Sequence, residues 1–123
     1  MRASLSDETL SSGAFLARLA ERVPEIARLV AENRKLNFGQ VIPHQVMGDI
    51  PAWIIRELLE PGAGQAPSAV GDALDALEEA VSPPGPSAAV DDLVRGSFLA
   101  HLWKAPRVTR LLGSSLREML KDF

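Results

Sequence analysis

The sequence contains no cysteine. A chain without thiols forms no disulfide framework, holds no zinc ion or iron–sulfur cluster through thiolates and has no cysteine nucleophile. Aromatic residues are also scarce, at 5% of the chain. Leucine, valine, isoleucine and alanine must therefore fill most of the hydrophobic core.

Long apolar runs are absent as well. No stretch approaches the roughly 20 consecutive apolar residues that a transmembrane helix requires. Residues 1–8 carry one arginine and two acids, and no apolar segment follows them, which argues against a secretory signal. We therefore expect a cytoplasmic protein that has no membrane partner.

The length of 123 residues is typical of one domain. Hydrophobic residues make up 46% and charged residues 24%, as in an ordinary soluble globular protein. We expect a single helical domain over 1–123, with residues 1–10 frayed. A domain of this size can bury enough surface to fold without a metal or a disulfide.

Apolar residues recur at spacings of three and four along most of the chain, and no long stretch alternates with period two. This periodicity predicts amphipathic helices and no sheet. We therefore predict an all-α fold, an irregular bundle of five or six helices with short loops. The predicted stripes are Phe15, Leu19, Val23, Ile26 and Val30; Val46, Ile50, Trp53, Ile54 and Leu58; Val70, Leu74, Leu77 and Val81; Val90, Leu93, Val94, Phe98, His101 and Leu102; and Val108, Leu111, Leu112, Leu116, Met119 and Leu120.

Several polar residues and prolines mark the ends of these helices. Ser11 or Ser12, Ser68 and Ser87 are suitable N-caps. Pro24 predicts either a kink in one helix or the start of a second, and the unbroken apolar phase favours the kink. Pro51 lies either in the first turn of a helix capped by Asp49 or inside a helix that begins near Pro43 and bends.

Residues 57–94 contain no lysine or arginine, so all of their charged residues are acids. Asp72, Asp75 and Glu79 share one predicted helix face, and Glu78 widens it. Such a face either keeps the protein hydrated or binds a basic partner. As partner-binding candidates we predict Asp72, Asp75, Glu78, Glu79, Asp91 and Asp92.

The C-terminal segment has the opposite charge. Its polar residues follow spacings of three and four on one predicted face, which could contact phosphates. The face could instead be solvated, or the acidic helix could pack beside it and pair with it. Because the chain is acidic overall and shows no nucleic-acid motif, we do not expect nucleic acid as the main partner. The stripe comprises Arg107, Arg110, Ser114, Arg117 and Lys121.

The two histidines give little support for catalysis or metal binding. Ser97 and His101 are four residues apart on one helix, but nothing marks an orienting acid or an oxyanion hole. His101 is better explained as a core-edge histidine with a local hydrogen bond. His44 and Asp49 alone make a weak metal site. We therefore predict no enzymatic activity, no metal and no cofactor.

The two tryptophans receive different predictions. Trp53 lies on the apolar face of its helix beside Ile50 and Ile54, so we place it in the core. Trp103 lies beside the main stripe of its helix and precedes Lys104. Because tryptophan is frequent in binding hot spots, Trp103 joins the partner-binding candidates.

The stretch from Val41 to Leu59, VIPHQVMGDIPAWIIRELL, resembles part of a family of small helical bacterial proteins of unknown function. The later Ser97-Phe98-Leu99 adds to that resemblance. Small acidic helical bacterial proteins of this size also include many immunity proteins, which bind and block a toxin. That similarity implies inhibition by binding, without a cofactor.

The sequence thus favours a non-catalytic protein-binding domain, an immunity-like inhibitor that captures a basic partner through its acidic face. The alternatives are a nucleic-acid-associated regulator that uses the C-terminal basic stripe and a helical oligomerisation module.

Overall fold

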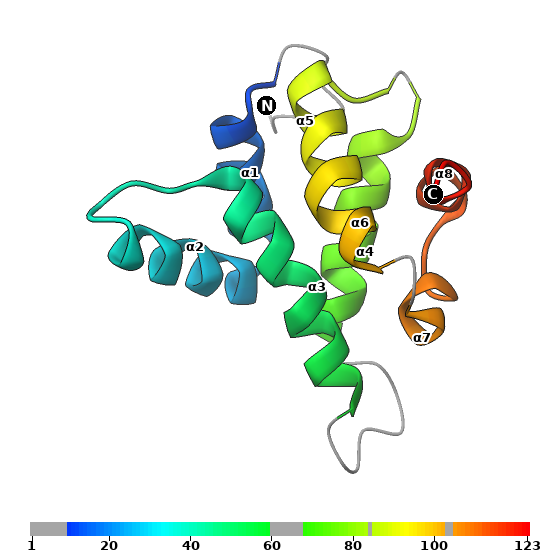
Figure 1. Ribbon diagram of the computed structural model, residues 1–123, viewed down its shortest axis with the longest axis horizontal. Helices are drawn as coiled ribbons and strands as arrows, with labels where there is room; N and C mark the ends of the chain where they lie inside the picture. Colours follow the sequence, from blue (N-terminus) through cyan, green and yellow to red (C-terminus); the bar gives the residue numbers. More distant parts are fainter. Residues whose placement is uncertain (1–9, 60–67, 84, 103–104) are drawn as a thin grey trace.

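The computed structural model describes residues 10–59, 68–83, 85–102 and 105–123. Every regular element within these residues is a helix, which confirms the all-α prediction (Figure 1). Residues 1–9 of the predicted frayed segment lie outside the described residues, whereas Leu10 is buried. The elements are α1 (Ser12–Arg22), α2 (Pro24–Leu36), α3 (Pro43–Leu59), α4 (Ser68–Val81), α5 (Ala88–Leu93), the π-helix η1 (Val94–Leu99), α6 (Ala100–Leu102), α7 (Pro106–Thr109) and α8 (Ser114–Leu120).

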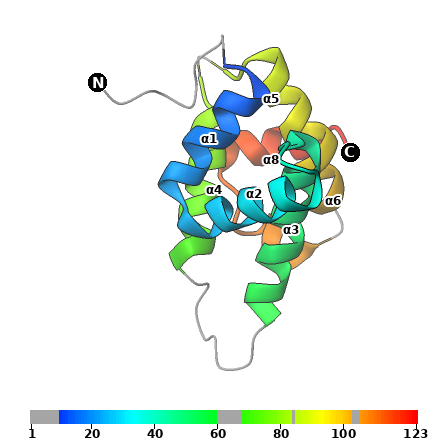
Figure 2. The ribbon, with the colours of Figure 1, turned by 90° about the vertical axis from the view of Figure 1, so that its left-hand side faces the viewer.

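Pro24 begins a new helix. The chain leaves helical geometry at Val23, whose φ of −130° and ψ of 100° are extended, and Pro24 is the first residue of α2. The favoured prediction of one kinked helix was therefore wrong. A proline at the first helical position loses no intrahelical hydrogen bond and has its φ already set, and α2 turns away from α1 (Figures 1 and 2).

Pro51, in contrast, lies inside a helix. The helix α3 runs from Pro43 to Leu59 through the proline, so the alternative of a helix that begins near Pro43 was correct. Proline in this position removes one backbone donor and weakens the helix. Its ring is buried, together with Ile50 and Trp53, and burial of apolar surface offsets part of this cost.

Two serines begin helices as predicted. Ser11 Oγ accepts the N–H of Ala14 at 3.2 Å and caps α1. Ser87 Oγ accepts the N–H of Val90 at 3.1 Å and caps α5. The Ser87 hydroxyl also donates to the carbonyl of Leu10 at 2.6 Å, so the same cap holds the chain that leads into α1.

The C-terminal apolar stripe belongs to two helices rather than one. The chain leaves α7 after Thr109 and enters α8 at Ser114, with Gly113 in extended conformation as the N-cap residue. The predicted continuous basic stripe is therefore wrong, because Arg107 lies on α7 and Arg117 on α8. A guanidinium nitrogen of Arg117 donates to the carbonyl of Arg110 at 2.7 Å across this break.

The core is built mostly from the predicted stripes, although Leu111 of the C-terminal stripe is exposed. Trp53 is buried, and so are all four members of the stripe on α4. Phe15 and Phe98 are the largest of the fully buried side chains. The helices α1, α3, α4 and α5–α6 enclose this core, while α2 and α8 lie on opposite sides of it (Figures 1 and 2).

Candidate interaction surfaces

The exposed acids of α4 lie beside α1. Asp72 and Asp75 are exposed, on the side of α4 away from its buried stripe. Together with Glu21 and Arg22 they line a polar cleft of about 310 Å³. We call Glu21, Asp72 and Asp75 the α1–α4 acidic patch. The ion pairs between described residues involve none of the three, so their carboxylates are open to a partner.

Glu78 faces the other way and caps α8. One of its carboxylate oxygens accepts the N–H of Leu116 and the other that of Ser115, both at 2.9 Å. Burial by itself would raise the pKa of this carboxyl. The two backbone donors and the hydroxyls of Ser115 and Ser82 outweigh burial and hold the pKa below its ordinary value. The negative charge also lies at the positive end of the α8 dipole, where it is stabilising.

Gly113 makes this cap possible. A Cβ atom at position 113 would lie 2.5 Å from the carboxylate carbon of Glu78, a separation that atoms do not tolerate. The absence of a side chain therefore lets Glu78 approach the start of α8. The acidic helix does pack beside the basic segment, as one alternative held, but it binds backbone N–H groups instead of basic side chains.

Glu79 is held by α1. Its carboxylate lies 2.5 Å from a guanidinium nitrogen of Arg22. The two side chains are partly exposed, so the pair contributes little to stability, about 0–1 kcal/mol. The pair does hold Arg22 beside the α1–α4 acidic patch, and Glu79 neutralises part of the positive charge of Arg22 in the free protein.

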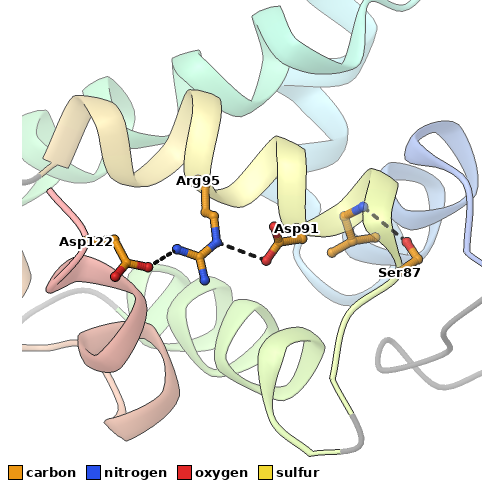
Figure 3. A network of polar contacts seen from close by, with 5 residues as sticks. Ser87, Asp91, Arg95 and Asp122 are labelled. Atoms are coloured by element: carbon orange, nitrogen blue, oxygen red, sulfur yellow. Dashed lines mark hydrogen bonds and ion pairs between the residues drawn. The ribbon is translucent and has the colours of Figure 1, made fainter.

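Asp91 belongs to an internal network at the C-terminus (Figure 3). Its carboxylate accepts from Arg95 at 3.0 Å, and the same guanidinium also contacts Asp122. The hydrogen bond with Asp122, and to a smaller extent the one with Asp91, raises the pKa of Arg95 above its ordinary value. The network thus ties α5–η1 to the residues after α8, and Asp91 already has a base.

Asp92 pairs with a histidine from another helix. His44 on α3 lies between Asp92, 3.1 Å from Nε2, and Ser97, whose hydroxyl oxygen is 2.6 Å from Nδ1. An ionised carboxylate can only accept, so Nε2 carries a proton. In the neutral imidazole Nδ1 then accepts from the Ser97 hydroxyl. The sequence had paired neither Asp92 nor Ser97 with His44.

This arrangement resembles the order of a serine–histidine–acid triad, but its surroundings favour a structural role. Ser97 is buried and lies within the π-helix η1, where backbone N–H groups are used in helical bonds. Stabilising an oxyanion requires donors that are free and aimed at the reacting atom. We therefore interpret the hydrogen bond between His44 and Ser97 as a connection from α3 to η1.

The helix α3 approaches the continuous segment η1–α6 through glycines on both sides. A Cβ at Gly48 would lie 3.7 Å from Cε1 of His101, and one at Gly96 would lie 3.8 Å from Cε1 of His44. Each histidine thus covers the glycine of the opposite helix. His101 Nδ1 also lies 2.6 Å from the carbonyl oxygen of Ser97, the local hydrogen bond that was predicted, although its side chain is exposed.

A surface that sequence reasoning missed lies between α2 and α3. Leu36, Phe38 and Ile42 are among the exposed large apolar residues, and Phe38 is 100% exposed. Its φ of 56° lies in the left-handed region, which is uncommon for an aromatic residue. We call Arg34, Lys35, Leu36, Phe38 and Ile42 the α2–α3 tip. Periodicity could not find it, because it lies where the helical pattern ends.

The remaining candidates give no further site. Trp103 lies outside the described residues. Within the described parts of the chain, His, Asp and Glu side chains form no group of three that could hold a metal ion. Among the same residues, no helix is both long and apolar enough to cross a membrane.

Comparison with protein-family models, curated proteins and solved structures finds no match for this chain. Functional inference therefore depends on the geometry of the surfaces described above.

Proposed function

We propose that this chain is a non-catalytic domain that binds another protein through the α1–α4 acidic patch. The observation that carries the proposal is the division among the acids. Glu78, Glu79, Asp91 and Asp92 are engaged inside the molecule. The carboxylates of the patch remain on an exposed surface shared by two helices.

The mechanism is electrostatic capture. Three acids and one arginine line the cleft, and the guanidinium of that arginine is itself paired with Glu79. The surface therefore has negative potential and attracts a partner that presents lysine or arginine. Charges of this kind act mainly on the association rate, and salt screens them beyond about 8 Å at physiological ionic strength.

The partner class in this proposal is a basic enzyme, such as a bacterial toxin that the domain would block by covering its surface. One support is the resemblance to immunity proteins noted from the sequence. The other is the acidic surface of this chain, because an enzyme that acts on a polyanion has a basic surface to which such a patch can bind. Inhibition of this type requires no cofactor and no chemistry from the bound chain.

The test is charge reversal with a matched control. Immobilised wild-type chain captures binding proteins from the lysate of its source cells, and association rates with the purified partner are measured at two salt concentrations. The patch variant is Asp72→Lys/Asp75→Lys. The control is Glu32→Lys/Asp49→Lys, which changes the net charge equally at exposed positions outside the patch.

We expect the patch variant to associate about tenfold more slowly at low salt, as is common when charge complementarity is reversed. The control should stay near the wild-type rate, and the difference should shrink as salt rises. Equal rates for the two variants would show that net charge, and not the patch, controls binding, and the proposal would then fail.

A nucleic-acid function has less support. The basic stripe is split between α7 and α8, and Arg117 already donates to the carbonyl of Arg110. Few phosphates can be neutralised by such a surface. Tight, sequence-dependent binding to duplex DNA at physiological salt would favour this alternative over the acidic patch.

A further inference from the structure

The α2–α3 tip lies at one end of the longest axis of the molecule (Figure 1). Phe38 is 100%, Leu36 78% and Ile42 37% exposed. Exposed apolar side chains are common one at a time, but a contiguous group indicates a contact surface. Here the three lie within seven residues, from the last residue of α2 to the residue before α3.

Internal hydrogen bonds hold this connection in place. The buried side chain of Asn33 accepts the N–H of Ile42 at 2.8 Å and donates to Gln45 at 2.9 Å. Asn37 donates to the carbonyl of Asn33 at 2.8 Å. These bonds fix the backbone of the loop, so Phe38 stays in solvent although its left-handed backbone is unfavourable.

The charge at the tip differs from that of the whole chain. Arg34 and Lys35 are exposed next to Leu36, and no acid occurs from Asn33 to Gly48. The net charge of the chain, by contrast, is −3. A negatively charged surface would therefore attract the molecule with this end first.

We propose that the α2–α3 tip docks the protein onto an anionic lipid surface, with the apolar side chains in the interface and the two bases among the headgroups. The size of the surface favours lipid over protein. A stable protein interface needs about 20–30 residues a side, whereas membrane attachment can be achieved by a few apolar groups combined with nearby bases. The proposal departs from the sequence expectation of no membrane partner and is independent of the α1–α4 acidic patch.

The test is sedimentation of the full chain with vesicles of phosphatidylcholine alone or of equal parts phosphatidylcholine and phosphatidylserine. The key variant is Phe38→Asn, because asparagine tolerates the left-handed backbone and removes the ring. A second variant, Arg34→Gln/Lys35→Gln, removes the bases. The control is Leu59→Asn/Leu111→Asn, which removes two exposed apolar side chains elsewhere.

We expect the wild-type chain to bind the anionic vesicles reversibly. Binding should be weaker by about tenfold or more for Phe38→Asn, because apolar burial is lost, and for Arg34→Gln/Lys35→Gln, because attraction to the headgroups is lost. The control and Asp72→Lys/Asp75→Lys should still bind, which separates this proposal from the acidic patch. Absence of wild-type binding, or equal loss in the control, would overturn the proposal. If vesicles fail to bind while Phe38→Asn abolishes capture of a protein, the tip contacts protein instead.

Discussion

The region around α4 and α8 and the region between α2 and α3 use polar side chains in opposite ways. On α4, Glu78 turns inward and its charge begins another helix. Between α2 and α3, Asn33 turns inward and its hydrogen bonds leave Phe38 in solvent. In the first region a predicted binding residue serves the fold. In the second, the buried polar residue serves an exposed apolar surface. Exposure therefore has to be judged from contacts and not from residue type.

The largest effect is expected at the buried asparagine. Asn33→Ala removes the acceptor of the Ile42 N–H and one of the two donors to Gln45 Oε1, which Asn37 also contacts. Lost hydrogen bonds of this kind cost about 0.5–1.5 kcal/mol each. We expect a loss of about 2 kcal/mol in the free energy of unfolding, measured by urea denaturation. Asn37→Ala, which removes a more exposed amide, should cost clearly less. Equal costs would mean that Asn33 does not organise the loop.

The next effect concerns the cap of α8. Gly113→Ala places a Cβ against the Glu78 carboxylate, and Glu78→Ala removes the cap directly. Each should lower the free energy of unfolding by about 1–2 kcal/mol, the usual value of a helix cap. Because both variants disrupt the same contact, the double variant should lose less than the sum. Additive losses would separate the glycine from the cap.

A smaller effect is expected for Ser97. Ser97→Ala removes the hydrogen bond to His44, whose ring is half-exposed and can bind water instead. We expect a loss of about 1 kcal/mol in the free energy of unfolding. Wild-type protein should also resist covalent labelling by a fluorophosphonate. Labelling that disappears in Ser97→Ala would show a reactive serine and contradict the structural interpretation.

The smallest effect is a pH dependence that also belongs to Glu78. Its pKa in the folded chain lies below the ordinary value of 4.5. The stabilisation from its charge is therefore complete above pH 4.5 and is lost as pH falls through the folded pKa. Chemical denaturation from about pH 6 down to about pH 3 should show a steeper loss for wild type than for Glu78→Gln. Parallel curves would contradict the assigned role of the carboxylate.

Much of the fold could be predicted because helical periodicity is local. The stripe on α4, the buried position of Trp53 and the caps at Ser11 and Ser87 each depend on residues within a few positions of one another. The break at Val23 was missed because an apolar stripe can continue in phase across two helices. The split at Gly113 was missed for a different reason, since the group that caps α8 comes from α4.

The candidate surfaces were predicted less completely. Sequence placed Asp72 and Asp75 on a polar face, and the structure leaves them exposed. It gave no means to distinguish them from Glu78 or Glu79, because their partners come from α8 and α1. The α2–α3 tip was missed entirely. Its signal would have been an unusual one, an aromatic residue directly before a glycine at the end of a helical pattern.

What the sequence determined by itself is therefore the helical class, most of the core and the unequal distribution of charge. The helical class and the core follow from the spacing of apolar residues over one or two helical turns, and the charge distribution follows from composition. Only the tertiary structure decided which acids remain free and which apolar side chains stay exposed. The partners of Glu79 and His44 lie 57 and 48 residues away in the chain, and the spacing of residues along one helix carries no information about contacts at that range.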